Sequence, residues 1–246
     1  MLNALGPQVA IVDYGMGNLF SVKHACEQAG LGTSITASSK EILASSAVIL
    51  PGVGAFGDAM ETLQRLDLVS VLRDVAASGK PMLGICLGMQ LLMTESHEFG
   101  RHRGLGIIEG EVVRLIESVD GTRRLKVPHI GWNRIYPRNP TTVLGDGLIS
   151  WKGSMLEGLL DGDFMYFVHS FFPRPLDTSA VLSTTRHGPI EFCSSLRSGG
   201  VFACQFHPER SGPQGLRVYR NLATSIQKIE RGQQDVIPAR SEIRTT

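Results

Sequence analysis

The chain is organised around the stretch Lys80-Pro81-Met82-Leu83-Gly84-Ile85-Cys86-Leu87-Gly88-Met89-Gln90-Leu91-Leu92. An apolar run of strand character leads to Cys86, which lies between Gly84 and Gly88, and a helix-like pattern follows. This Gly-x-Cys-x-Gly spacing is typical of a nucleophile elbow, in which a strained residue on a tight strand-to-helix turn needs small neighbours. The helix N-terminus below the thiol favours thiolate over thiol. A buried cysteine is usually only a small hydrophobe, but this context predicts that Cys86 is a nucleophile.

A second motif lies near the end of the chain, at Val201-Phe202-Ala203-Cys204-Gln205-Phe206-His207-Pro208-Glu209. Pro208 favours an extended conformation for His207, and alternate side chains of an extended segment point the same way. We therefore expect His207 and Glu209 on one side of the segment. A carboxylate beside an imidazole fixes the tautomer and stabilises the imidazolium, which is the orienting role in a nucleophile–base–orienter triad. The sequence predicts that Cys86, His207 and Glu209 form such a triad.

Composition narrows the class of protein. The 246 residues are 42% hydrophobic and 19% charged, which fits one globular α/β domain with an ample core. A net charge of +1 gives no electrostatic reason to expect nucleic acid or an anionic membrane as a partner. No signal peptide and no membrane-spanning run are visible. Four cysteines without Cys-x-x-Cys spacing indicate neither a metal site nor a disulfide framework, so we expect a reduced, cytoplasmic enzyme without cofactor.

The order of elements predicts an open, mostly parallel sheet with helices on both faces and an added β-rich segment. Strands are expected at 8–14, at 47–50, in the apolar run that leads into Gly84, and in the last strand, which starts near Val201 and carries His207 and Glu209. Helices are expected at 18–29, 56–65, 68–78 and 214–229. The β-rich segment spans 104–174, with strands at 104–108, 111–115, 131–135 and 164–168. A single domain is expected over 8–229, with flexible termini at 1–7 and 230–246.

A glycine-rich loop, Pro51-Gly52-Val53-Gly54, follows the second clear strand. Such a loop exposes backbone N–H groups beyond a strand end, and it is either a tight connection or half of an oxyanion hole. Donors held ready for an oxyanion lower a barrier by about 3–4 kcal/mol. The turn Gly15-Met16-Gly17, in contrast, matches neither of the glycine patterns that bind nucleotide phosphates.

Together these motifs resemble the class I (triad) glutamine amidotransferases, and within them the glutaminase subunits of imidazole glycerol phosphate synthases of histidine biosynthesis. The resemblance covers roughly residues 8–227 and follows the family's order. Besides the elbow, it rests on the stretches Asp13-Tyr14-Gly15-Met16-Gly17-Asn18-Leu19, Leu50-Pro51-Gly52-Val53-Gly54-Ala55-Phe56, Pro128-His129-Ile130-Gly131-Trp132-Asn133, Phe167-Val168-His169-Ser170 and Gln205-Phe206-His207-Pro208-Glu209-Arg210-Ser211.

The resemblance implies further site residues. The N–H of Leu87, with that of Val53 or Gly54, would form the oxyanion hole, and the loop would switch between inactive and active states. His169 would give structural support rather than catalysis. Glutamine would be held by Gly52, Gln90, Glu98, Ser170 and Phe171, and the partner would contact Asn18, Pro128, His129, Trp132 and Arg210.

The resemblance also implies an activity and a partner. The chain would hydrolyse L-glutamine to glutamate and ammonia without metal or organic cofactor. It would deliver the ammonia to a separate (β/α)₈ synthase subunit, which makes imidazole glycerol phosphate and an aminoimidazole carboxamide ribonucleotide. Weak activity alone and stimulation by the synthase ligand are expected.

Three alternatives stay open at this point. One is a sister glutaminase that supplies ammonia to a sugar amidotransferase in surface-polysaccharide synthesis. Three departures from the family pattern favour it. The segment between Asn133 and Phe167, which contains Trp151-Lys152-Gly153-Ser154, is a few residues longer than expected. Thr185-Arg186-His187-Gly188 replaces the usual Tyr-Gly pair, and Ala203-Cys204 replaces the usual Gly-Val type pair. The others are a cysteine peptidase of similar architecture and an inert scaffold that activates a synthase.

Overall fold

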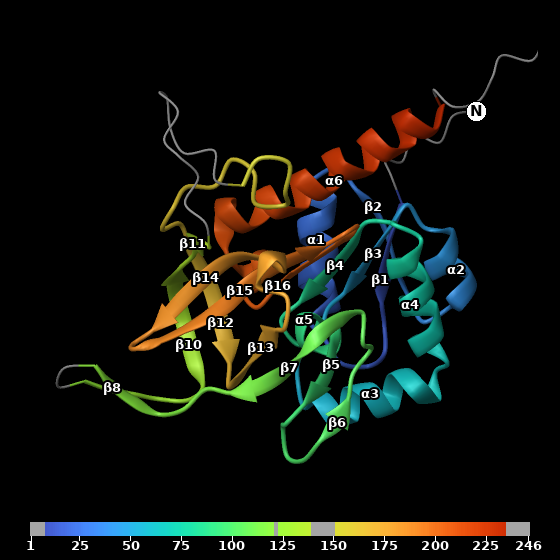
Figure 1. Ribbon diagram of the computed structural model, residues 1–246. Helices are drawn as coiled ribbons and strands as arrows, with labels where there is room; N and C mark the ends of the chain where they lie inside the picture. The colour runs from blue at the N-terminus through green and yellow to red at the C-terminus, as the bar shows by residue number, and fades with distance from the viewer. Residues whose placement is uncertain (1–7, 121–122, 139–150, 235–246) are drawn as a thin grey trace, which may run out of the picture.

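Five strands of the main sheet run parallel, in the order β2-β1-β3-β4-β16, with β2 at the edge (Figure 1). The computed structural model describes residues 8–120, 123–138 and 151–234. All four residues of β3 and of β4 are buried, as expected of strands covered on both faces. The strand bounds are Gln8–Val12 (β1), Gly32–Thr36 (β2), Ala47–Leu50 (β3), Met82–Ile85 (β4) and Val201–Cys204 (β16).

The sheet continues beyond β16 with antiparallel strands. These are β15 (Ile190–Ser198), β14 (Val181–His187) and β11 (Tyr136–Pro137). The parallel part has the flavodoxin-like order, for which ligands are expected beyond the carboxyl ends of the strands. The predicted fold class, an open and mostly parallel sheet between helices, is confirmed.

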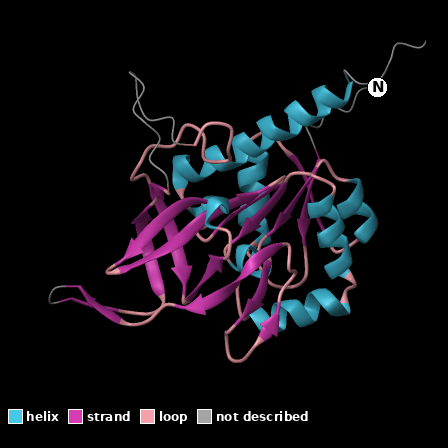
Figure 2. Cartoon of the chain, viewed as in Figure 1, coloured by secondary structure: helices cyan, strands magenta, loops and turns pink. Residues whose placement is uncertain are grey.

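Helices cover both faces of this sheet, as Figure 2 shows. Alternate residues of a strand point to opposite faces, so Ile11 and Ile49 join one apolar core while Val12 and Val48 join the other. The first core is closed by α1 (Leu19–Gln28) and α6 (Gly212–Gln234). The second is closed by α2 (Ser39–Ala44), α3 (Phe56–Arg65), α4 (Leu68–Ala77) and α5 (Leu87–Leu91).

The β-rich segment forms smaller sheets beside the main one. Strands β13 (Phe171–Pro175), β7 (Ile108–Arg114), β5 (Met93–Ser96) and β6 (His102–Arg103) make a four-stranded sheet. Strand β10 (His129–Arg134) pairs with β12 (Phe164–His169), and the hairpin of β8 (Ser118–Asp120) and β9 (Arg123–Leu125) projects from the body (Figure 1). Two short 3₁₀ helices are η1 (Thr178–Ala180) and η2 (Pro208–Arg210).

Two predicted elements differ from the structure. Residues 104–107 are not a strand, because the N–H groups of Leu105, Gly106 and Ile107 bind the carbonyls of Leu91, Met93 and Leu92 at the end of α5. The last helix does not end at 229 but continues to Gln234, so the segment predicted to be flexible from 230 begins as helix.

The described residues leave part of the domain prediction open. The remaining predicted termini, 1–7 and 235–246, lie outside them, as do residues 139–150 of the long segment. The single-domain assignment over 8–229 stays a prediction. Among the helices that the structure describes, none is long and apolar enough to cross a membrane.

Close packing at the elbow requires glycine at position 88, because no side chain would fit there. A Cβ at Gly88 would overlap the carbonyl oxygen of Leu50 on β3, which is backbone and cannot rotate away. A Cβ at Gly84 would lie 3.1 Å from the Cβ of Ala203. Helix α5 can therefore lie directly on β3 and β4 only with glycine at this position.

We predict that Gly88→Ala lowers the free energy of unfolding by about 2–3 kcal/mol, because overpacking against rigid backbone forces α5 away from β3. Gly232→Ala is the matched control, since Gly232 is in α6 with nothing within 4 Å of an added Cβ. In a helix this change should stabilise by about 0.5–1 kcal/mol. Urea unfolding of both variants measures the difference, and equal stabilities would contradict the packing argument.

Candidate active site

The elbow places Cys86 at the N-cap of α5. Its backbone has φ +54° and ψ −108°, a conformation that L-residues rarely adopt and that is typical of strained functional positions. The turn is held by hydrogen bonds from the N–H of Cys86 to the carbonyl of Cys204 at 2.8 Å and from the N–H of Met89 to the carbonyl of Cys86 at 3.0 Å. The first N–H groups of α5 have no acceptor within the helix and are available to an anion beside the thiol.

His207 and Glu209 meet directly after β16. His207 Nδ1 is 2.7 Å from Glu209 Oε1, and the two side chains are only 6% and 2% exposed. His207 is extended, with φ −100° and ψ 93°, as the following proline predicted. The chain does not stay extended, because Pro208–Arg210 forms the 3₁₀ turn η2, and this turn sets Glu209 against His207. Glu209 thus occupies Nδ1 of His207, while Nε2, the other ring nitrogen, is buried and has no hydrogen-bond partner in the described part of the chain.

The charges around His207 favour its protonated form. Burial lowers the pKa of the ring, but the negative charge of Cys86, together with the charge and hydrogen bond of Glu209, outweighs burial and raises the pKa to about 10. His207 is therefore an imidazolium at neutral pH when Cys86 is a thiolate. The structure thus brings Cys86 and Glu209 close enough to His207 to shift its pKa, and the role of the three residues as a catalytic triad stays a prediction.

A cavity of about 290 Å³ opens over Cys86. It is lined by Val53, Gly54, Cys86, Leu87, Gln90, Glu98, Pro128, Val168, His169, Ser170 and Phe171. All the predicted oxyanion and glutamine-binding residues except Gly52 are in this set, and buried Gly52 packs behind it, where a Cβ would meet Leu87 and the Tyr14 hydroxyl. A larger cavity of about 410 Å³ lies at the opposite ends of β4 and β16, near Gly79 and Gly200. It has no cysteine or histidine in its lining, so the nucleophile lies in the smaller cavity.

The predicted oxyanion donors come from two chain segments. Gly54 has φ +112°, and a Cβ there would lie 2.6 Å from the Met16 methyl group. Val53 is exposed at the cavity, and Leu87 is the first residue of α5. Their roles as donors stay predictions.

Glu98 has a contact that the sequence did not predict. Its Oε2 accepts a hydrogen bond from the N–H of Phe56 at 2.6 Å, at the N-terminus of α3, where the N-cap Ala55 has no capping side chain. A carboxylate is favourable at this end of the helix dipole. Glu98 thus lines the cavity and also holds the segment that follows the Gly52–Gly54 loop.

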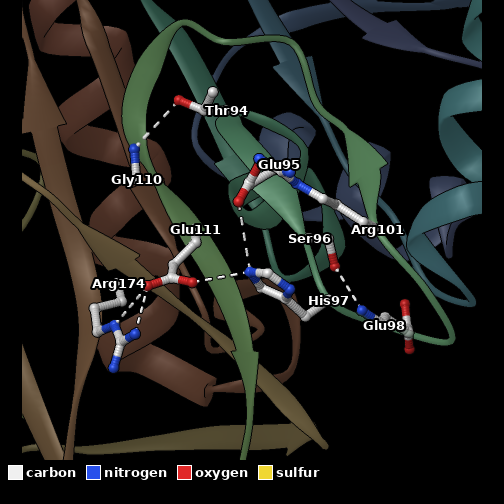
Figure 3. Close-up of polar contacts among 9 residues, drawn as sticks. All are labelled: Thr94, Glu95, Ser96, His97, Glu98, Arg101, Gly110, Glu111 and Arg174. Atoms are coloured by element: carbon white, nitrogen blue, oxygen red, sulfur yellow. Dashed lines mark hydrogen bonds and ion pairs between the residues drawn. The ribbon is translucent and has the colours of Figure 1, made fainter.

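Next to Glu98, the side chains of Glu95, His97 and Glu111 form a cluster whose ligand atoms lie within 4.8 Å of one another (Figure 3). His97 Nε2 is 2.9 Å from Glu111 and 3.5 Å from Glu95. Each carboxylate is also paired with an arginine, Glu95 with Arg101 and Glu111 with Arg174, and the Arg174 hydrogen bond lowers the pKa of Glu111. Because the arginines already balance both charges, this cluster favours a structural role in joining β5, β7 and β13 over a metal site.

A pair of buried histidines supports the other side of the cavity. His129 Nδ1 is 3.1 Å from His169 Nε2, and His169 Nδ1 is 2.9 Å from the carbonyl of Phe171. Burial, with a smaller contribution from neighbouring histidines, lowers the pKa of His129 to about 4 and that of His169 to about 3. Both rings are therefore neutral at pH 7, in keeping with the predicted supporting role of His169.

His129 faces inward rather than toward a partner. Alternate side chains of β10 point to opposite sides, so Ile130 and Trp132 are 60% and 55% exposed while His129 is 5% exposed. Pro128 and Arg210 are exposed, and the Arg210 guanidinium lies 5.0 Å from the centre of the Tyr166 ring. Asn18 is exposed and accepts a capping hydrogen bond from the N–H of Ser21.

Sequence reasoning missed several residues at these sites. Phe20, 81% exposed, and Ile130 belong to the exposed apolar surface near Asn18 and Trp132. Gln205 Nε2 is 3.5 Å from Cys86 Sγ, and the hydroxyl of Tyr14 donates to the carbonyl of Pro51 at 2.8 Å. A polar glutamine after the fully buried strand β16, two positions before His207, was the available signal for Gln205.

Comparison with known proteins agrees with this geometry. The model of the family described as "Glutamine amidotransferase class-I" matches residues 10–225. The chain is 44% identical over 223 residues to the imidazole glycerol phosphate synthase subunit HisH of Aquifex aeolicus, covering 90% of this chain and 99% of that protein. It is 43% identical over 217 residues to the HisH subunit of Rhodopirellula baltica, covering 88% and 97%.

Solved structures share the fold at lower identity. PurLQS from Thermotoga maritima matches with a TM-score of 0.64 and 19% identity, over 90% of this chain and 99% of that one. A crystal structure of a glutamine amidotransferase matches with a TM-score of 0.62 and 19% identity, over 87% and 98%.

Because His129 and His169 are neutral in the folded protein, we predict that the free energy of unfolding decreases at acid pH. Folded His129 and His169 have pKa values of about 4 and 3, and unfolded histidine has about 6.5, so unfolding takes up two protons as pH falls below 6.5. The free energy of unfolding should then decrease by up to about 2.7 kcal/mol per pH unit. His207, with a folded pKa of about 10, opposes this slope only near pH 6.5, because below that pH the unfolded histidine also becomes protonated.

Urea unfolding between pH 6.5 and 5 measures this slope. His129→Phe should halve it, whereas His24→Gln, which changes an exposed histidine on α1, should leave it unchanged. A free energy of unfolding that is constant over this range would show that the pair is not neutral in the folded protein.

The charge of Cys86 predicts the behaviour of His207. No thiolate forms in Cys86→Ser, so the negative charge that raises the pKa of His207 is lost, while burial still lowers that pKa. The pKa of His207 should therefore fall from about 10. A histidine-selective NMR titration of both proteins measures the midpoint, with Cys26→Ser as control, because it replaces a buried thiol that is not among the groups shifting the pKa of His207. An unchanged midpoint in Cys86→Ser would mean that Cys86 does not face His207 as a thiolate.

Proposed function

The chain belongs to the class I glutamine amidotransferases, and on that premise we propose that it is the glutaminase subunit of an imidazole glycerol phosphate synthase in histidine biosynthesis. One observation carries the proposal. A strained cysteine at a helix N-terminus lies close enough to the His207 imidazole to raise its pKa, and Nδ1 of that imidazole is 2.7 Å from a buried carboxylate. The similarity to HisH subunits over about nine-tenths of the chain supports the pathway.

The mechanism follows from the geometry of these side chains. Cys86 attacks the side-chain amide carbonyl of L-glutamine, and His207 donates a proton to the departing ammonia. Water then hydrolyses the glutamyl thioester, with His207 as the base. Glu209 holds the ring so that Nε2 faces the reacting atoms and stabilises its charge. Glutamate and ammonia are the products, and protein groups alone perform each step.

Backbone donors would stabilise the tetrahedral intermediates. The N–H of Leu87 is at the start of α5, and the flexible backbone around Gly54 would supply the N–H of Val53 or Gly54. Gly52, Gln90, Glu98, Ser170 and Phe171 would hold the substrate. Since Glu98 binds the N–H of Phe56, substrate binding at Glu98 and the position of the Gly52–Gly54 loop depend on the same carboxylate.

Ammonia is useful only if it reaches an acceptor before it is protonated in bulk water. We propose that a separate (β/α)₈ synthase subunit covers the cavity, against the exposed side chains of Trp132, Ile130, Pro128, Arg210 and the turn at Asn18 and Phe20. The exposed apolar area of these residues supports a protein partner. We place the heterodimer in the cytoplasm.

The alternatives have less support. The relatives reported above carry the imidazole glycerol phosphate synthase name, which disfavours the polysaccharide glutaminase. The assembled Cys86, His207 and Glu209 disfavour an inert scaffold, and the amidotransferase family match disfavours a peptidase.

The test is glutamate release from L-glutamine by the full chain, with and without the synthase subunit from the same source and its nucleotide ligand. We expect weak activity alone, strong stimulation in the complex, and a loss of at least about 10³-fold in Cys86→Ala. Cys26→Ala, which removes a buried thiol outside the lining of the cavity, should retain activity.

Each contrary result has a definite meaning. Full glutamine-dependent activity of the Cys86→Ala complex would replace the nucleophile assignment by the scaffold role. A chain that hydrolyses glutamine but does not bind the synthase would belong with the sugar-modifying sister enzymes.

A further inference from the structure

Gln205 is in contact with the reacting sulfur. It follows β16 directly, is completely buried, and its Nε2 is 3.5 Å from Cys86 Sγ. Its backbone N–H donates to the carbonyl of Ser194 at 2.9 Å, so both ends of the residue are held. Burying a side-chain amide lowers the stability of the fold unless the amide makes hydrogen bonds.

The orientation of the Gln205 amide follows from its other neighbour. Gln90 Nε2 lies 2.9 Å from the carbonyl of Phe171 and 3.0 Å from Gln205 Oε1. A backbone carbonyl only accepts hydrogen bonds, so the Gln90 atom beside it is the amide nitrogen. The Gln205 atom facing that nitrogen must then be oxygen, which turns the NH₂ group of Gln205 toward the sulfur.

The same carbonyl orients the histidine pair. His169 Nδ1 must carry the proton that it donates to Phe171, so the Nε2 of the neutral ring accepts from His129 Nδ1 at 3.1 Å. His129 Nε2 in turn accepts from Asn133 Nδ2, which also donates to the carbonyl of Arg186 at 2.8 Å. Donors and acceptors therefore agree along the network from Asn133 to the Phe171 carbonyl, where the Gln90–Gln205 branch begins.

We propose that Gln205 is a further catalytic residue, whose amide donates a hydrogen bond to the Cys86 thiolate, with Gln90 and the Phe171 carbonyl as the groups that hold it in the donor orientation. This rests on the proposed role of Cys86 as nucleophile. A donor to sulfur raises the fraction of thiolate at a given pH, which is the form that attacks. Titratable groups near the thiol are His207 with its partner Glu209, Tyr14 and Cys204, and Glu98 and His169 line the same cavity. Gln205 adds a donor there without adding charge.

The test is the pH dependence of alkylation of the full chain by iodoacetamide, with the modified peptide identified by mass spectrometry. Cys86 lines the cavity, whereas burial raises the pKa of Cys26, Cys193 and Cys204, so the reagent reports on Cys86. Gln205→Met keeps the volume and removes the donor. Its alkylation midpoint should rise by about one pH unit, with an approximately tenfold lower rate below the midpoint.

Ser183→Ala is the matched control, because it removes a buried hydroxyl that bonds Ser194 and Ser195 in the same sheet. Its midpoint should equal that of the wild type. A folded Gln205→Met protein with the wild-type midpoint would overturn the proposal.

A second measurement needs no variant at the site. In the wild type, the side-chain amide protons of Gln205 should move downfield in the NMR spectrum as Cys86 ionises, with the midpoint found by alkylation. Amide protons that do not respond would overturn the proposal even if Gln205→Met fails to fold. Absent glutaminase activity with normal alkylation of Cys86 would count against the proposed function instead.

Discussion

The contact between Gly88 and the carbonyl oxygen of Leu50 leaves no space for a side chain, and the site depends on it. Because α5 lies directly on β3, the cysteine at its N-terminus and the Gly52–Gly54 loop at the end of β3 line one cavity. Parallel strands bring their carboxyl ends to the same edge, so β4 supplies Cys86, β16 supplies His207 and β3 supplies the loop. The chemistry is assembled from three adjacent strand ends.

The second constraint is electrostatic. His207 and Glu209 form a buried ion pair, and a buried charge is tolerated only with its partner and hydrogen bonds. Four buried groups near this pair are kept neutral, since burial lowers the pKa of His129 and His169 and raises the pKa of Cys204 and Tyr14, whereas Glu98 lines the cavity as a carboxylate. The charge change on which the reaction depends is thereby confined to Cys86 and His207.

Glu98 connects binding to the loop that follows β3. Its carboxylate caps α3 through the N–H of Phe56, while the same side chain lines the cavity. An ammonium group in the cavity would compete for this carboxylate, because both are donors to the same oxygens. The arginine-paired cluster of Glu95, His97 and Glu111 (Figure 3) anchors the end of β5 from which Glu98 projects.

The sequence by itself determined the elbow, the helices at 56–65 and 68–78, and the mostly parallel sheet, because glycine spacing and apolar periodicity report backbone conformation and burial directly. It also brought Cys86, His207 and Glu209 forward as candidates, since each belongs to a short motif. Only the tertiary structure decided that His129 faces inward, that η2 sets His207 against Glu209, that Glu98 caps α3 and that Gln205 reaches Cys86 across 119 positions. Hydrogen bonds between distant segments depend on how separate elements pack, and no local pattern records that.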